Sequence, residues 1–408
     1  MTRMRSTMVV VAITVVLNGL SAAGASVLLL RSLGSVRFGE VGTAIIVGNS
    51  LAALVSAAPT QSLYTLVGAD TRRSTFFGIS CRRDGLGVTI VTALAGLLLL
   101  VVAPSIGRAV LTGSCLVLPI ALAGFHVERI RLLASARAAS IWNCSRAVGA
   151  WSASVIIAVA TRNSAATVAA YGLAAAVAAT ASSRQFRTRS ETDLPGPLPV
   201  SRRIALPAIA SSYALTFADR LFVVQILGQA PLGLYSFAYQ LGEGAITLAF
   251  LPVTFVATVP VVARWAEGPI GRRAASRMAA SATGLVLGAA AAFEVGLFFV
   301  ARTNRWGVAL GQDHASATVI AQVAAIIVPG VALAGLTRIP AAILTRMGRA
   351  RLYTRLSVTV LAVTLVATGP VTYWGGVRAC AAVTTVAYTT LFLVTWLACA
   401  RLDHVNDV

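Results

Sequence analysis

Apolar runs of roughly 18 to 25 residues recur along the whole of this chain, and each is long enough to cross the ~30 Å hydrocarbon layer of a membrane as a helix. We predict twelve such spans, at residues 8–30, 41–67, 86–106, 109–134, 147–160, 164–181, 204–228, 234–262, 278–300, 317–345, 354–373 and 378–399. Inside hydrocarbon, a helix satisfies its own backbone hydrogen bonds. The sequence therefore predicts an all-α, polytopic membrane protein.

The bulk composition leads to the same class. Hydrophobic residues make up 57% of the 408 residues, charged residues 11%, and the mean hydropathy is +0.83. A soluble domain does not need so many apolar residues to form one hydrophobic core. Residues 1–25 have the layout of a secretory signal, but the apolar run continues through Leu30 and eleven more spans follow, so we assign these residues to the first span.

The basic residues are placed unevenly between the two sides of the predicted spans. The formal net charge is +20, and all 33 basic residues are arginines. With a cytoplasmic amino terminus, 24 arginines fall in inner segments, 7 fall in outer segments, and Arg220 and Arg338 fall inside spans. Short basic loops are retained in the cytoplasm, so we expect both termini there. No segment outside the spans is long enough for a nucleic-acid-binding module, so we expect no nucleic-acid partner.

The reactive side chains show no pattern of a metal centre or a catalytic site. Five cysteines and three histidines are scattered without paired spacing. The longest outer loop, RTNRWGVALGQDHASA, carries one Asp and one His, with neither HExxH nor paired carboxylates. We expect no cofactor and no metal, and we disfavour the remaining alternative of a membrane-embedded sugar polymerase or glycosyltransferase.

A polar, basic segment, Ser182–Arg203, divides the predicted spans into two sets of six. This segment contains three prolines, which rule out a continuous helix. We predict an amino-terminal six-helix lobe at 1–182, a cytoplasmic basic linker at 183–203, and a carboxy-terminal six-helix lobe at 204–408.

The two lobes share a short repeat. LGSVRFGEVGTAIIVGNS from Leu33 and LGQAPLGLYSFAYQLGEG from Leu227 align at a constant offset of 194, which places Gly34 on Gly228. Each copy joins the first span of its half to the second. Glycine matches between apolar spans also arise by chance, but repeated six-helix halves are a transporter architecture, with the substrate path between them.

Three stretches carry a resemblance to a known family: DRLFVVQILGQAPLGLYSFAY at 219–239, LLLRSLGSVRFGEVGTA at 28–44 and ILTRMGRARLYTRLS at 343–357. Their pattern resembles the Wzx-type polysaccharide and oligosaccharide flippases. These belong to the multidrug/oligosaccharidyl-lipid/polysaccharide exporter superfamily, which also contains the multidrug and toxin extruders and the lipid II flippases.

The resemblance implies two pseudo-symmetric six-helix lobes around a central cavity in the bacterial cytoplasmic membrane. It implies a flippase, not an enzyme, that moves undecaprenyl-linked oligosaccharide from the inner to the outer leaflet by alternating access. Membrane lipids, a glycan polymerase and glycosyltransferases are the further partners it implies. The alternative is a cation-coupled exporter of drugs or small amphiphiles. The extruders commonly carry a coupling acid in the first span, where this chain has only Asn18.

Charged side chains inside predicted spans are the main candidate site residues, because a charge at bilayer depth is costly and normally faces protein or water. Arg220 is a fixed cation suited to a diphosphate, since guanidinium offers planar, multidentate hydrogen bonding. The structural alternative is that Asp219 or Glu294 neutralises it. Arg338 either reaches the inner headgroups with its long stem or collects phosphate at the inner mouth.

The remaining candidates are weaker. Asn18, Asn49, Tyr239 and Gln240 are predicted sugar contacts, with helix-to-helix hydrogen bonds as the alternative. Asp219 and Glu243 join this predicted binding set, and Glu243 and Glu294 are the candidate coupling acids. Near the end of the fourth span, we interpret Glu128, Arg129 and Arg131 as an ion-paired interfacial turn.

Overall fold

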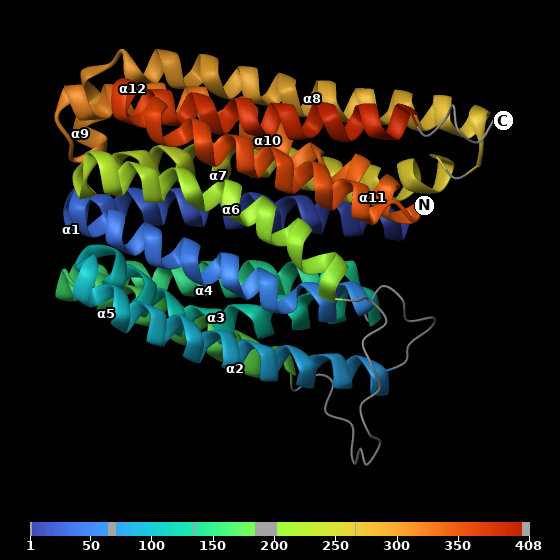
Figure 1. The fold of residues 1–408 in the computed structure, drawn as a ribbon, viewed down its shortest axis with the longest axis horizontal. Helices are drawn as coiled ribbons and strands as arrows, with labels where there is room; N and C mark the ends of the chain where they lie inside the picture. Colours follow the sequence, from blue (N-terminus) through green and yellow to red (C-terminus); the bar gives the residue numbers. More distant parts are fainter. Residues whose placement is uncertain (1, 64–70, 134, 184–201, 266, 402–408) are drawn as a thin grey trace. The chain divides into compact units, whose positions relative to one another are not determined.

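The computed structural model describes residues 2–63, 71–133, 135–183, 202–265 and 267–401, and within these ranges the regular structure is helical throughout (Figure 1). The chain divides into two compact units, Met1–Tyr213 and Ala214–Val408. The division lies inside a helix, after the predicted linker at 183–203.

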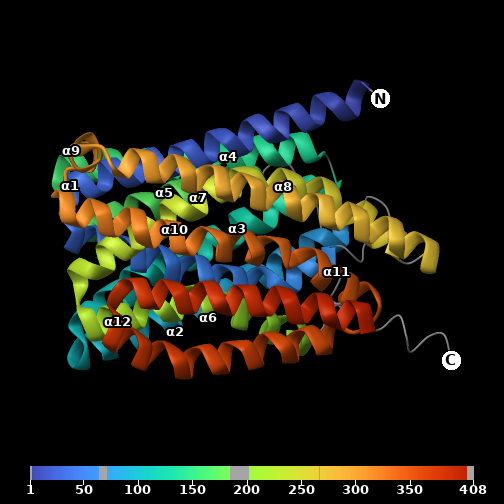
Figure 2. The same cartoon turned by 90° about the horizontal axis from the view of Figure 1, so that it is seen from above.

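Five described helices lie wholly in unit 1. They are α1 (Thr2–Leu63), α2 (Thr71–Val102), α3 (Pro104–Leu133), α4 (Ala136–Thr161) and α5 (Ser164–Ser183). Ala103 alone separates α2 from α3, and two residues separate α4 from α5. Such short connections make neighbouring helices antiparallel, and these neighbours pack against each other in the structure (Figures 1 and 2).

Unit 2 follows the same plan with two additional short helices. It holds most of α6 (Arg202–Leu227), then α7 (Gln229–Trp265), α8 (Pro269–Ala301), α9 (Asn304–Leu310), α10 (His314–Leu336), α11 (Arg338–Arg346) and α12 (Ala350–Arg401). Helix α10 packs against α7, α8 and α12, so it occupies the centre of the unit.

Two of the helices are each two membrane spans joined at a glycine. Helix α1 breaks at Gly34 (φ 74°, ψ 168°) and α12 breaks at Gly376 (φ 65°, ψ −156°), conformations that glycine adopts at little cost. Gly228, between α6 and α7, also has a positive φ of 95°. Gly34 and Gly228 are the residues that the sequence repeat aligns, and each separates the first span of its unit from the second.

The described helices account for twelve crossings. Eight are long and apolar enough to span a membrane, and two of these run for 52 residues, or about 78 Å, which is enough for two crossings each. Helices α6 and α7, with 26 and 37 residues, supply the other two. The prediction of an all-α protein with about twelve membrane spans is confirmed.

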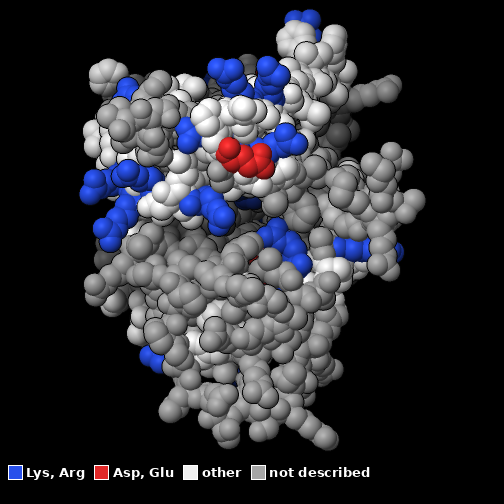
Figure 3. Space-filling model, turned by 90° about the vertical axis from the view of Figure 1, so that its right-hand side faces the viewer, with Lys and Arg blue, Asp and Glu red and all other residues white. Residues whose placement is uncertain are grey.

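Arginine side chains gather at one end of unit 2, where α7 is followed by α8 and α11 by α12. Figure 3 views this end, with arginines in blue. Its exposed arginines are Arg264, Arg273, Arg277, Arg346, Arg349, Arg351, Arg355 and Arg401. The expectation that this end faces the cytoplasm rests on the positive-inside rule.

Candidate functional site

The adjacent charges of α6 are buried in unit 2. Asp219 is 3% exposed and Arg220 is 1% exposed. The Asp219 carboxylate accepts hydrogen bonds from the Tyr235 hydroxyl at 2.5 Å, the Thr384 hydroxyl at 3.1 Å and the backbone N–H of Arg220 at 2.7 Å. These donors come from α7, α12 and α6, so one carboxylate ties three helices together.

The guanidinium of Arg220 has a different environment. Its central carbon lies 4.4 Å from the centroid of the Tyr239 ring, a cation–π contact. Its Nε and Nη1 atoms are buried and have no hydrogen-bond partner among the described residues. No ion pair joins Arg220 to Asp219 or Glu294 in the part of the chain that the structure describes. Unsatisfied buried donors on a charged group are rare and costly.

A second hydroxyl pair lies beside the guanidinium. The Tyr239 and Tyr388 hydroxyls are 3.0 Å apart, and the Tyr235 and Tyr239 rings are 6.4 Å apart. Tyr235 and Tyr239 are four residues apart on α7, and Thr384 and Tyr388 are four apart on α12, so each pair shares one helix face. The faces of α7 and α12 that meet here are lined with hydroxyl groups.

Glu243 extends this row by one further turn of α7. Its side chain is exposed, and it interacts electrostatically with Arg220 and, more weakly, with Arg338. Arg338, the first residue of α11, is also exposed, and Gln240 is half-buried. Unit 2 therefore groups five of the predicted site residues with Glu243: Asp219, Arg220, Tyr239, Gln240 and Arg338.

The remaining predicted residues lie elsewhere. Asn18 and Asn49 are half-buried in the two spans of α1, in unit 1. Glu294 is half-buried on α8, beside the buried stripe that includes Ala290 and Leu297. Among the described residues, no hydrogen bond or ion pair connects Glu294 to the Arg220 cluster.

Tyr235, Thr384 and Tyr388 belong to the cluster but are absent from the sequence-based set of site residues. Tyr235 stands in the GLYS motif one turn before Tyr239, so the four-residue spacing of two tyrosines was an available signal. Thr384 and Tyr388 lie in CAAVTTVAYTT, an apolar span with no charge to mark it. Nothing local in the sequence distinguishes them from the other hydroxyl residues of the spans.

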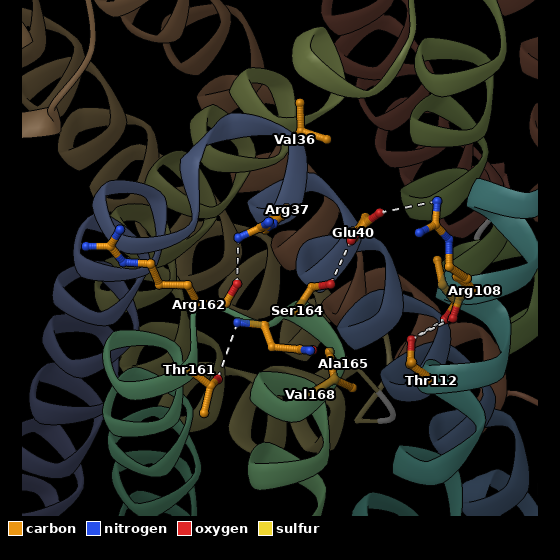
Figure 4. Close-up of a pocket in the computed structure, with 12 residues that line it drawn as sticks. Val36, Arg37, Glu40, Arg108, Thr112, Thr161, Arg162, Ser164, Ala165 and Val168 are labelled. Carbon is orange, nitrogen blue, oxygen red and sulfur yellow. Dashed lines mark hydrogen bonds and ion pairs between the residues drawn. The ribbon is translucent and has the colours of Figure 1, made fainter.

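Unit 1 has a separate polar hollow of about 680 Å³ where α1 turns at Gly34 and α4 is followed by α5 (Figure 4). The Glu40 carboxylate accepts a hydrogen bond from Ser164 at 2.7 Å and lies 3.9 Å from an Arg108 nitrogen. Arg37 donates to the backbone carbonyl of Arg162 at 2.7 Å. Three arginines and one glutamate give this hollow a net positive charge.

Among the described residues, no group of three or more His, Cys, Asp or Glu side chains could hold a metal ion. No protein-family model matches the chain, and no curated protein matches it by sequence. Solved structures do match over nearly its whole length.

One is an inward-facing multidrug resistance MATE family transporter of the MOP superfamily, with a TM-score of 0.57 and 13% identity over 98% of this chain and 94% of that chain. The fold is that of the MATE transporters. A second match, the MATE multidrug transporter DinF-BH in complex with a ligand, has a TM-score of 0.58 and 13% identity over 97% of this chain and 94% of that one.

A third is a MOP superfamily transporter from Pyrococcus furiosus, for which reverse polarity of the binding pocket suggests a different function. Its TM-score is 0.54, with 12% identity over 98% of this chain and 95% of that chain. The structural neighbours are thus MOP-superfamily transporters, and identities this low establish the shared fold alone.

Proposed function

We propose that this chain is a MOP-superfamily transporter that flips an undecaprenyl-linked oligosaccharide from the inner to the outer leaflet of the bacterial plasma membrane by alternating access. The shared fold supports the transporter class. The observation that carries the substrate class is the buried Arg220 guanidinium, which has two nitrogens without a hydrogen-bond partner among the described residues and lies beside Tyr239, whose hydroxyl contacts that of Tyr388.

The chemistry of the cluster favours an anionic headgroup. Asp219 and Glu243 lie close enough to Arg220 to interact with it electrostatically, but two nitrogens of its buried guanidinium have no hydrogen-bond acceptor among the described residues. The oxygens of a diphosphate are acceptors that the planar N–H groups of a guanidinium bind well. Arg220 is shielded in this conformation, so the substrate reaches it when the packing of α6, α7 and α12 loosens during the transport cycle. The tyrosine hydroxyls and Gln240 then supply hydrogen bonds for the sugar.

A cation-coupled exporter of drugs or small amphiphiles is the second candidate. Glu243 supports it, because its exposed carboxylate lies in the same row as the tyrosines. Multidrug transporters share the fold as well. Arg220 and Arg338 both act electrostatically on Glu243, however, and two nearby cations weaken its attraction for another cation. A neighbour with the same fold, the Pyrococcus furiosus transporter, has a binding pocket of reverse polarity that suggests a different function.

Two conservative substitutions separate the candidates. Purified protein in proteoliposomes is assayed for transfer of a short fluorescent undecaprenyl diphosphate sugar and, in parallel, for uptake of a fluorescent cationic dye. We expect lipid transfer in the wild type and a loss of at least tenfold in Arg220→Gln, with Glu243→Gln retaining most transfer. Arg355→Gln, an exposed arginine of α12, is the matched control and should transfer as the wild type does.

The opposite pattern would contradict the flippase proposal. It consists of dye uptake that Glu243→Gln abolishes, together with lipid transfer that is no faster than in empty vesicles. Thermal unfolding of each variant in detergent shows whether a lost activity reflects lost folding.

A further inference from the structure

A second hollow, of about 560 Å³, lies in unit 1 between α2, α3 and α5. One side is cationic and polar, with Arg82, Arg129 and His126 among its lining residues. The other side is apolar, with Ile79, Leu118 and Leu122. None of its described lining residues is acidic.

Arg129 is built into the wall of this hollow. It is 3% exposed, and its Nε and Nη2 atoms donate to the hydroxyls of Ser74 at 2.8 Å and Thr75 at 2.7 Å. The sequence analysis placed Arg129 in an ion-paired turn with Glu128 and Arg131. The structure shows that Glu128 pairs with Arg131 at 2.9 Å, three residues along α3, while Arg129 points inward to α2. The hydroxyl bonds hold the guanidinium in one orientation.

His126 adds an unsatisfied group to the same wall. It lies three residues before Arg129 on α3, is 9% exposed, and its Nδ1 atom is buried with no hydrogen-bond partner among the described residues. Buried polar atoms normally have a partner. An oxygen-rich ligand in the hollow would supply one.

The position of the hollow indicates where such a ligand comes from. It lies near the start of α2 and the ends of α3 and α5, the end of unit 1 whose segments are predicted to be cytoplasmic. Ile79 lines the hollow and is also 58% exposed, on a helix that exposes further apolar side chains such as Leu86 and Ile90 beyond the arginines at 82 and 83. The hollow therefore opens on a surface suited to lipid, with its arginines at headgroup depth.

We propose that this hollow binds the phosphate headgroup of an anionic phospholipid of the inner leaflet. Arg129, Arg82 and His126 contact the phosphate and its glycerol oxygens, and an acyl chain lies along Ile79, Leu118 and Leu122. A small inorganic anion would make no favourable contact with the apolar side of the hollow. A zwitterionic lipid places a cation next to the arginines. The site goes beyond the proposed transport function and is built from unit 1 alone.

Neighbouring arginines of α2 provide a matched test. Arg82 and Arg83 are both exposed, but only Arg82 lines the hollow. The full-length protein is purified, stripped of lipid, and titrated with phosphatidylglycerol or phosphatidylcholine, with bound lipid counted by native mass spectrometry. We expect saturable binding of phosphatidylglycerol that is at least fivefold tighter than that of phosphatidylcholine. Arg82→Gln should weaken it about tenfold, the effect of losing one charge-assisted contact. Arg83→Gln should leave it unchanged.

His126→Gln tests the unsatisfied nitrogen in a second way, because glutamine keeps a hydrogen-bonding group but changes its position. We expect a loss of binding smaller than that of Arg82→Gln, with unchanged thermal unfolding of the lipid-free protein.

Competition identifies the ligand. Equal affinity for the two phospholipids, or equal effects of Arg82→Gln and Arg83→Gln, would overturn the proposal. So would displacement by inorganic phosphate alone, or by undecaprenyl phosphate far below the phosphatidylglycerol concentration, which would make the hollow a substrate site. Arg220→Gln should leave phosphatidylglycerol binding intact, so failure here is distinct from failure of the flippase proposal.

Discussion

The two units place their charges differently. In unit 1 charged side chains line two hollows, one around Glu40 and one around Arg129. In unit 2 an acid and a base lie fully buried in the middle of α6. The repeat offset of 194 makes the comparison exact by position, because Asp219 and Arg220 correspond to Ala25 and Ser26 of α1.

Ala25 and Ser26 are also buried, at 6% and 2% exposure. Farther along, Tyr235 and Tyr239 of α7 correspond to Val41 and Ile45, which are buried as well. The shared architecture thus determines which positions are enclosed, and the residue type then decides whether the enclosed site is inert or charged. Unit 1 fills these positions mostly with apolar side chains that need no partners. Unit 2 fills them with charged and hydroxyl-bearing side chains that need several hydrogen-bond partners. The core of unit 2 is therefore polar at positions where the core of unit 1 is mostly apolar.

The largest expected effect comes from removing the buried acid. Asp219→Ala leaves the Tyr235 hydroxyl without its acceptor, leaves the Thr384 hydroxyl only the Cys380 carbonyl, and removes a buried negative charge that interacts with Arg220. We therefore expect a loss of about 3–5 kcal/mol of stability. Thermal unfolding in detergent and the yield of monodisperse protein measure it. The converse change, Ala25→Asp, should destabilise unit 1 by a similar amount, because the position in unit 1 that corresponds to Tyr235 is Val41, which cannot donate a side-chain hydrogen bond to a carboxylate. Tolerance of Ala25→Asp would show that the two cores do not differ as proposed.

The second prediction tests a point where the units agree. Gly34 and Gly228 have positive φ values, and a Cβ at either position would have no heavy atom within 4 Å. Alanine there introduces backbone strain without a clash, so we expect Gly34→Ala and Gly228→Ala each to cost about 1–2 kcal/mol.

Gly24→Ala is the control for these two glycines, because Gly24 is helical and equally uncrowded. It should be neutral or stabilising. Unequal losses at Gly34 and Gly228 would mean that the aligned turns are not structurally equivalent.

A smaller effect is expected from the tyrosine pair. Tyr388→Phe keeps the ring and removes one hydroxyl from the contact with Tyr239, which should lower stability by about 1 kcal/mol. Tyr373→Phe, at an exposed position of α12, should change nothing measurable. If both variants unfold like the wild type, the hydroxyl row does not stabilise the core of unit 2.

The sequence predicted the fold well because span length and hydrophobicity are properties of each segment by itself. As far as the structure describes them, all twelve predicted spans correspond to helical segments, and Gly34 and Gly228 mark turns through local backbone geometry. The candidate site was predicted less completely, because its contacts join segments distant in sequence. Asp219 is bonded to Thr384, 165 residues away, and a threonine in an apolar span carries no sign of such a partner.

Arg129 shows the same limit of sequence-based prediction, because here the sequence offers local partners that the side chain does not use. Local spacing offers it two neighbours of the right kind on α3, and i, i+3 pairing indeed occurs between Glu128 and Arg131. Arg129 turns instead to Ser74 and Thr75 on α2. The direction of a side chain on a helix depends on which neighbouring helix packs there, and that information is not local.

The smallest effect is expected at the hollow around Glu40, where the charges of unit 1 lie in contact with solvent. Arg108 is 64% exposed on its side chain and its nitrogen is 3.9 Å from the Glu40 carboxylate, so solvent and salt screen the pair. Arg108→Gln should therefore cost less than about 1 kcal/mol, and raising the salt concentration should reduce the difference from the wild type. Glu40→Gln also weakens the bond from Ser164, so it should cost somewhat more than Arg108→Gln. A loss at Arg108 as large as that for Asp219→Ala would remove the distinction between the screened charges around Glu40 and the enclosed charges of α6, because exposure would then no longer predict the energetic cost.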